Sequence, residues 1–175
     1  MYKKLSSKIV FTHPRMTLVE DQIELPNGHQ ADYLWTDHRI DGVTVIAKDQ
    51  TGLILVEKEY SYLPNRSLYQ FAGGGINAGE EPEAAANREL GEEVGLYAGR
   101  LISIGTYYLD HRRTDALMHV FLGEEITARK SETSDIYEVD MQALWISEAE
   151  IEELIAKREI VNSPMLACWS LYKSR

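Results

Sequence analysis

The stretch GGINAGEEPEAAANRELGEEVGL, residues 74–96, decides the fold, because it joins a glycine-rich segment to one acidic helix. We expect a tight turn over Gly73–Gly75. The helix should begin near Pro82, since proline fits the first helical turn, where its missing N–H is not needed. Gly95 should then end the helix as a left-handed cap. The rest of the chain is interpreted as support for this turn and helix.

Three carboxylates of the expected helix share one arc of its surface. At about 100° per residue, Glu89 and Glu93 are one turn apart, and Glu92 lies about 60° to the other side of Glu89. Ala85 falls on the same arc, where its small side chain would let a ligand approach. Three like charges repel one another unless the face is solvated or holds cations. Clustered hard oxygens suit Mg²⁺, which keeps several waters and bridges to substrate phosphates.

The charged and glycine residues of this stretch fall in a fixed register. They are Gly74, Glu80, Arg88, Glu89, Glu92, Glu93 and Gly95, and together with Leu90 and Leu96 they resemble a complete Nudix box. The alternative is an exposed acidic helix, which is what most charge runs are. Because each fixed residue type has a usage of roughly 7% or less, seven matching positions occur by chance about once in 10⁸ windows. The register therefore favours the Nudix interpretation.

A magnesium site follows from this interpretation, with Mn²⁺ as a substitute ion. We expect Glu89 and Glu93 to be the main ligands and Glu92 to be a further ligand or to act through a water. The resemblance adds the carbonyl of Gly73 as a fourth candidate. Glu92 and Glu93 are thereby also candidate catalytic residues. Divalent ions neutralise a diphosphate, orient it and lower the pKa of bound water.

Two residues of the box are expected to support the ligands rather than bind metal. Arg88 lies one turn before Glu92 and could hold that carboxylate in place. Glu80 and Arg88 together should orient the helix and the turn. The general base is implied only by the resemblance, which puts it in a loop beyond the box. Glu132 is the first candidate and Asp135 the second, and either one is equally well a solvated loop carboxylate.

Signals for substrate recognition are weaker. Arg66, Arg112 and Arg113 are candidate phosphate contacts, because guanidinium pairs well with phosphate. Each of them is also an ordinary surface residue if taken alone. Trp35 and Tyr62 could stack on a base, although packing is the expected role of both.

The order of segments also resembles one Nudix branch, the ADP-ribose and nucleotide-sugar pyrophosphatases. The resemblance rests on the N-terminal hairpins, Leu55-Val56 before a tyrosine-rich loop, and the segments 71–76 and 119–121. It implies that a nucleoside diphosphate sugar, ADP-ribose or similar, is hydrolysed to a nucleoside monophosphate and a sugar phosphate. The branch usually has arginine where Ser61 stands and a Ser-Pro-Gly-like loop near 110–114. This chain lacks both, so the sugar stays open.

Two other functions fit the same residues less well. One is hydrolysis of a nucleoside triphosphate or a capped RNA end by the same chemistry. The other is a non-catalytic nucleotide-binding module, which should have lost metal ligands, whereas Glu89, Glu92 and Glu93 are all present.

The patterning predicts an α/β/α sandwich with mixed sheets. We expect one Nudix domain over residues 1–175, with 1–41 as an antiparallel hairpin extension that serves, by analogy with the branch, in a homodimer. Expected strands are 8–11, 17–25, 31–35, 42–47, 52–57, 98–109, 116–122 and 138–146. Loops are expected at 60–66, 110–115 and 123–137. Further helices should begin after Ser147 and at Ser163.

Composition narrows the function classes. The chain has 175 residues, a net charge of −10 and an isoelectric point near 5.0, so non-specific nucleic-acid binding, which needs a basic footprint, is not expected. Cys168 is the single cysteine and is expected to pack in the core. No apolar run approaches a membrane span, and the basic N-terminal segment has no apolar signal core. A cytoplasmic protein that binds no membrane is the expectation.

Overall fold

The structure, a computed structural model, describes residues 1–37, 40–129 and 141–175. Its contacts divide the chain into two compact units, and each is described by itself. Unit 1 comprises residues 1–41 and 108–117, and unit 2 comprises residues 42–107 and 118–175. The candidate bases Glu132 and Asp135 lie outside the described residues.

The described elements alternate between strands and helices. In chain order they are β1 (Lys3–His13), β2 (Met16–Glu24), β3 (Gln30–Asp37), β4 (Gly42–Ala47), β5 (Ile54–Ser61), β6 (Arg66–Gln70), β7 (Ala72–Gly75), α1 (Pro82–Val94), β8 (Leu96–Tyr108), β9 (Leu117–Ala128), β10 (Gln142–Ile146), α2 (Glu148–Ala156) and α3 (Ser163–Lys173).

Unit 1 is built on an antiparallel sheet in the order β1-β2-β3. The turn between β2 and β3 closes with a bond from the amide of Gly28 to the carbonyl of Leu25 (2.9 Å), and Gly28 adopts φ 81°. The predicted N-terminal hairpins are thereby confirmed. The loop that follows β8 belongs to this unit, since the amide of Thr36 in β3 donates to the carbonyl of Arg113 (2.6 Å).

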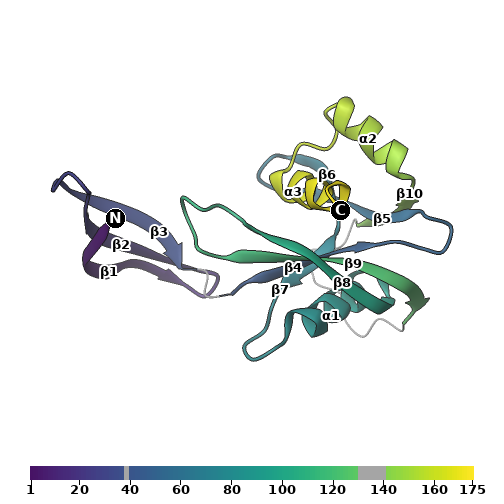
Figure 1. The fold of residues 1–175 in the computed structure, drawn as a ribbon, viewed down its shortest axis with the longest axis horizontal. Helices are drawn as coiled ribbons and strands as arrows, with labels where there is room; N and C mark the ends of the chain where they lie inside the picture. The colour runs from purple at the N-terminus through teal and green to yellow at the C-terminus, as the bar shows by residue number, and fades with distance from the viewer. Residues whose placement is uncertain (38–39, 130–140) are drawn as a thin grey trace. The chain divides into compact units, whose positions relative to one another are not determined.

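Unit 2 contains two sheets. One has the order β7-β4-β9-β8, in which β4 pairs antiparallel with β7 and parallel with β9, and the other is an antiparallel sheet in the order β10-β5-β6. Helix α1 lies on one side of the four-stranded sheet, and α2 and α3 lie on the other (Figure 1). The predicted α/β/α sandwich with mixed sheets is confirmed.

Two apolar clusters fill the layers of unit 2. On the α1 side, Ala85, Ala86 and Leu90 pack against β4 residues such as Val43 and Val45. On the other side, α3 packs its core residues, among them the fully buried Cys168, against Ile46 and Val56. Strand β4 is buried along its whole length because both clusters contact it. The predicted core position of Cys168 is confirmed.

The helix ends follow the predicted signals. Helix α1 begins at Pro82, and Gly95 ends it in the left-handed region (φ 65°), with its amide bonded to the carbonyl of Gly91 at 3.1 Å. Ser147 and Glu150 form a reciprocal capping box at the start of α2. Helix α3 begins at Ser163. None of the helices in the described ranges combines the length and apolar character needed to cross a bilayer.

Three sequence expectations were wrong. Gly73–Gly75 belong to strand β7 rather than to a turn, because β4 accepts them as an antiparallel neighbour. Strand β9 continues to Ala128, where an irregular segment was expected from residue 123. The expected loop at 60–66 shortens to residues 62–65, since β5 and β6 form a hairpin on either side of it.

Glu148 ties α2 to α3, which gives the fold a defined pH dependence. Its carboxylate accepts bonds from the hydroxyl of Tyr172 (2.6 Å) and from the amino groups of Lys48 and Lys173 (both 3.2 Å). The bond from Tyr172, with those from the two lysines, lowers the pKa of Glu148 from its usual 4.5 to about 2.

We therefore expect Glu148→Gln to be less stable than the wild type at pH 7. A group whose pKa is lowered by folding contributes stability above its unfolded pKa, and loses it as pH falls through the folded pKa. The difference between variant and wild type should shrink between about pH 4.5 and pH 2. Denaturant unfolding at several pH values measures this difference, and an equal difference at pH 7 and pH 3 would contradict the assignment.

Candidate active site

The candidate site is built where strand β7 meets helix α1. Within the described residues, β7 is the end strand of its sheet. One of its two edges therefore pairs with no strand, and α1 contacts that edge. The amide of Gly73 donates to the carboxylate of Glu93 at 2.8 Å. The N–H and C=O of one residue in an antiparallel strand point the same way. The carbonyl of Gly73 therefore also points toward this edge, beside Glu93.

Two glycines make this close approach feasible. A Cβ on Gly73 would collide with the backbone carbonyl oxygen of Val43, which cannot move without breaking the β4–β7 pairing. A Cβ on Gly74 would lie 2.5 Å from a carboxylate oxygen of Glu89. The glycines of β7 are thus required for contact with β4 on one side and with an acidic side chain of α1 on the other.

The two glycines should respond differently to alanine. Gly73→Ala should lower the free energy of unfolding by about 1–3 kcal/mol, as overpacking against backbone does. Gly74→Ala should displace the Glu89 carboxylate, which is the end of a flexible chain, and so reduce turnover with a smaller loss of stability. Thermal unfolding and turnover rates of both variants check this, and a Gly73→Ala protein that melts like the wild type would contradict it.

Arg88 connects the acidic residues of the site. Its guanidinium donates to Glu80 at 2.9 and 3.0 Å, to Glu89 at 2.8 Å and to Glu92 at 3.0 Å. It also donates to the carbonyl of Gly75 at 2.7 Å. The predicted support of Glu92 by Arg88 is confirmed, and the same side chain ties α1 to the end of β7.

Glu80 completes the link between the strand and the helix. Its second carboxylate oxygen accepts the amide of Asn77 at 2.9 Å, which fixes the turn between β7 and α1. The hydrogen bond from Arg88 holds the pKa of Glu80 below its usual value. The same bond with Glu80 is the main cause of the raised pKa of Arg88. Both groups therefore stay charged near neutral pH.

Glu89 is the least exposed of the three carboxylates that bond to Arg88, and Glu80, at 17% side-chain exposure, is close to it. Only 13% of the Glu89 side chain is exposed, whereas 40% of the Glu92 side chain is exposed. Burial raises the pKa of Glu89, while the neighbouring Arg88 opposes this shift. A charge in such a place needs compensation, which Arg88 provides and a cation would provide more strongly.

The three predicted carboxylates do not converge on one point. Glu89 and Glu92 accept hydrogen bonds from Arg88, whereas Glu93 accepts one from the amide of Gly73. No three acidic, histidine or cysteine side chains within the described ranges are gathered closely enough to enclose an ion. Mg²⁺ is usually held by one or two carboxylates together with substrate phosphates and waters. Two carboxylates beside a backbone carbonyl at the β7 edge fit that requirement.

Two expectations about neighbouring side chains were wrong. Ala85 is not on the open arc but completely buried in the apolar cluster under α1, because the helix turns that face toward β4. Tyr62 does not pack, since 83% of it is exposed at the tip of the β5–β6 hairpin.

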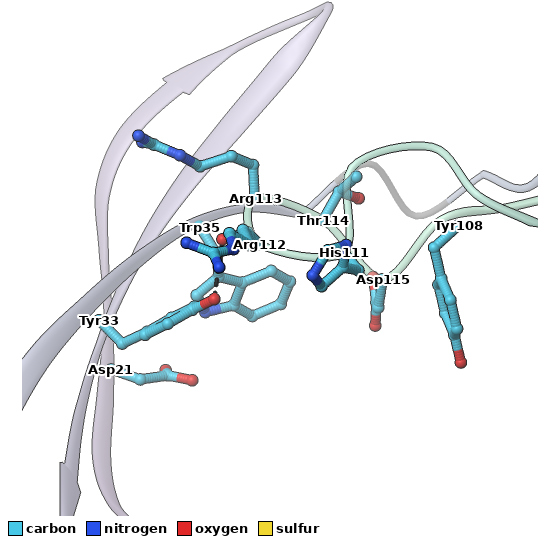
Figure 2. Close-up of a pocket in the computed structure, with 9 residues that line it drawn as sticks. All are labelled: Asp21, Tyr33, Trp35, Tyr108, His111, Arg112, Arg113, Thr114 and Asp115. Carbon is cyan, nitrogen blue, oxygen red and sulfur yellow. Dashed lines mark hydrogen bonds between the residues drawn. The ribbon is translucent and has the colours of Figure 1, made fainter. Parts of the chain in front are cut away.

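A pocket of about 310 Å³ lies within unit 1 (Figure 2). Arg112 and Arg113, two predicted substrate residues, line it together with Trp35 and Tyr33. The hydroxyl of Tyr33 donates to the carbonyl of Arg112 at 2.8 Å and so anchors the loop over the β3 aromatic residues. The indole nitrogen of Trp35 is buried and, among the described residues, has no hydrogen-bond partner.

The remaining predicted residues are placed as follows. Arg66 is exposed at the start of β6 in unit 2 and does not line the unit 1 pocket. His119, for which a structural role was expected, lies in β9 opposite Val43. Sequence reasoning missed Tyr33 as a pocket residue. The signal was available, because residues two apart on a strand share one face and Tyr33 is two residues before Trp35.

Comparisons with known proteins identify the family. The NUDIX domain model matches residues 38–167, and the nucleoside diphosphate sugar hydrolase N-terminal domain model matches residues 2–34. An ADP-ribose pyrophosphatase of Bacillus subtilis (strain 168) is 29% identical over 92% of this chain and 86% of its own length. An ADP-ribose pyrophosphatase of Mycobacterium tuberculosis (strain ATCC 25618 / H37Rv) is 28% identical over 95% of this chain and 80% of its own length.

A solved structure shows the same fold. The crystal structure of an ADP compounds hydrolase superposes with a TM-score of 0.89 at 18% identity, and the match covers 99% of this chain and 92% of that one. The domain model that spans residues 38–167 contains the whole β7–α1 arrangement described above. The chain therefore belongs to the Nudix family and is a pyrophosphohydrolase that carries the N-terminal domain of the nucleoside diphosphate sugar hydrolases.

Proposed function

We propose that this protein hydrolyses the diphosphate linkage of a nucleoside diphosphate sugar, ADP-ribose or a similar compound. The products are a nucleoside monophosphate and a sugar phosphate. The observation that carries the proposal is the placement of Glu93 and Glu89 of α1 against the Gly73–Gly74 edge of β7. The match of residues 2–34 to the hydrolase N-terminal domain, and the two ADP-ribose pyrophosphatases among the relatives, support the sugar nucleotide.

Some groups of the site are proposed to bind the metal ion, and others orient those ligands. Glu89, Glu93 and the carbonyl of Gly73 are the proposed ligands of Mg²⁺, for which Mn²⁺ is a substitute, and Glu92 contributes directly or through a water. When bound, the ion neutralises phosphate charge and lowers the pKa of water. Arg88 orients Glu89 and Glu92 through its hydrogen bonds and opposes the rise in the pKa of Glu89. The backbone N–H of Gly73 fixes the carboxylate of Glu93, so that the acid face is rigid before substrate arrives.

The proton acceptor for the attacking water stays a prediction, with Glu132 before Asp135. Glu132→Gln should lower kcat by about a hundredfold or more, which is within the usual contribution of a general base. Asp135→Asn is the matched control in the same segment, and it should have the smaller effect. If kcat of Glu132→Gln is unchanged, Glu132 has no role in the mechanism.

The pocket of unit 1 is our candidate for binding the nucleoside. Its volume of about 310 Å³ reaches the range usual for ligand pockets. Tyr33 and Trp35, which both line the pocket, offer aromatic side chains to a base. Arg112 and Arg113 bring positive charge to the same pocket. Arg66 is a further proposed phosphate contact, on unit 2.

A second copy of the chain is the proposed partner of residues 1–41. All eleven residues of β1 are exposed, and Ile9 and Phe11 are 59% and 48% exposed. An edge strand with uncovered apolar side chains is a ready surface for pairing with another chain. Light scattering after size-exclusion chromatography should give the mass of a dimer, and a monomer at micromolar concentration would count against it. A cytoplasmic location stays a prediction.

A substrate panel tests the proposal. It contains ADP-ribose, UDP-glucose, ATP and a capped RNA, each assayed with Mg²⁺ for release of a nucleoside monophosphate or diphosphate. We expect a kcat/KM for the best sugar nucleotide at least tenfold above those for ATP and the RNA. A preference for ATP or for RNA would overturn the substrate class. Equal rates for adenine and uracil nucleotides would argue against the unit 1 pocket as a base site.

A further inference from the structure

Another pocket, in unit 2, lies on the opposite side of β7 from the Glu89 carboxylate. It has a volume of about 170 Å³, and its walls come from five elements, β4, β6, β7, β9 and α3 with its cap residue. Thr44 belongs to β4, Gly73 and Gly74 to β7, and Met118 to β9, while Asn162 lies at the start of α3. This is the α3 face of the sheet, where Cys168 closes the floor.

Strand β7 borders both this pocket and the acidic face, by which we mean the side of the site that carries Glu89 and Glu93. Gly73 lines the pocket, and its amide is also bonded to Glu93 of the acidic face. Gly74 lines the pocket too, and it contacts Glu89 on its other side. Gly73 and Gly74 therefore border both the pocket and the carboxylates of α1.

Asn162 contributes an acceptor to the pocket wall that lacks a donor. Its amide oxygen is buried, yet no donor in the ranges that the structure describes bonds to it. Asn162 also occupies the cap position of α3, where an asparagine oxygen ordinarily accepts a backbone N–H of the first turn. Here the side chain makes no such cap bond. A buried acceptor that forgoes its usual partner is costly unless another donor reaches it.

The size and the chemistry of the pocket limit what it can hold. Ligand pockets for whole drug-sized molecules usually measure about 300–1,000 Å³. A volume of about 170 Å³ therefore suits one part of a nucleotide sugar, of the size of a monosaccharide, rather than a nucleoside. Apolar walls from Met118 and Met165 are combined with the polar groups of Asn162 and Thr44. Such a mixture suits a sugar ring, with its C–H faces and its hydroxyl edges.

We propose that this pocket binds the sugar end of the substrate and that the side-chain oxygen of Asn162 accepts a hydrogen bond from a sugar hydroxyl. The inference rests on the proposed function and adds to it the residue that selects the sugar. Asn162 acts in specificity and takes no part in the chemistry at the diphosphate.

The test compares two substrates that share one nucleotide. ADP-ribose carries a sugar beyond the diphosphate, and the methyl ester of ADP carries none. Asn162→Leu keeps the size of the side chain and removes the acceptor. We expect kcat/KM for ADP-ribose to fall about 10- to 100-fold, because a substrate hydroxyl is left unpaired, while kcat/KM for the methyl ester changes less than about threefold. Ser163→Ala, at the exposed neighbouring position, should change neither value.

A second variant tests the pocket without touching α3. Met118→Phe narrows the opposite wall and should reduce the preference for ADP-ribose over the methyl ester in the same direction. The sugar assignment is overturned if both substrates lose activity equally in Asn162→Leu and Met118→Phe, or if neither is affected. A wild-type enzyme that hydrolyses the methyl ester as fast as ADP-ribose would also overturn it, while leaving the pyrophosphatase activity established. If the wild type hydrolyses neither of these substrates nor any sugar nucleotide of the panel above, the proposed function itself fails.

Discussion

Glu93→Gln should nearly abolish turnover while the protein remains folded. The glutamine can still accept the Gly73 amide through its side-chain oxygen, so the 2.8 Å contact between α1 and β7 is preserved. What is lost is the negative charge at the open edge, where the carbonyl of Gly73 also points. Losing charge stabilisation of several kcal/mol in the transition state corresponds to a fall in kcat of about a thousandfold.

Glu83→Gln is the matched control for this variant. Glu83 lies in the first turn of the same helix and is exposed, so the substitution makes the same change in net charge away from the β7 edge. Its turnover should be close to that of the wild type. Circular dichroism and thermal unfolding establish that both variants are folded. Wild-type turnover by a folded Glu93→Gln protein would remove this residue from the catalytic centre.

Arg88→Met should cost both stability and activity, because four groups of the site depend on one guanidinium. The substitution leaves Glu80, Glu89 and Glu92 close together without their shared cation, and it frees the carbonyl of Gly75. Breaking a buried ion pair costs about 3–5 kcal/mol, and the 26% exposure of the Arg88 side chain reduces this to about 2–3 kcal/mol. The melting temperature should fall by about 5–10 °C.

Arg88→Lys separates charge from geometry. Lysine keeps the positive charge but cannot form the paired bonds that the guanidinium makes to Glu80 at 2.9 and 3.0 Å, so we expect a result close to that of Arg88→Met. Arg100→Met is the control, since Arg100 is 62% exposed and pairs only with Glu124 in the contacts that are described. Equal melting temperatures of Arg88→Met and Arg100→Met would show that the network does not hold α1 to β7.

The box residues could be predicted because their order in the chain sets their placement on the helix. Pro82, Gly95 and the spacing of Glu89, Glu92 and Glu93 fixed the limits of α1 and the acidic face before any tertiary contact was known. The bond from Arg88 to Glu92 followed from the same one-turn spacing. Local rules were sufficient for this part of the site.

Other features depend on partners that are distant in the chain. Gly73–Gly75 read as a turn because glycine is typical of turns, and only the pairing with β4 makes them a strand. The helical angle alone puts Ala85 on the open arc, but the position of the sheet decides which side of α1 is buried. The pocket beside Asn162 joins residues from five elements, so no local pattern in the sequence indicates it.

The central claim is that the face formed by α1 and β7 binds a divalent cation together with a diphosphate. Isothermal titration calorimetry of Mg²⁺ into the protein, in the presence of a non-hydrolysable methylene analogue of ADP-ribose, tests it most directly. We predict saturable binding by the wild type that is lost in Glu93→Gln and kept in Glu83→Gln. Absence of any Mg²⁺ binding by the folded wild type, with the analogue present, would contradict the claim.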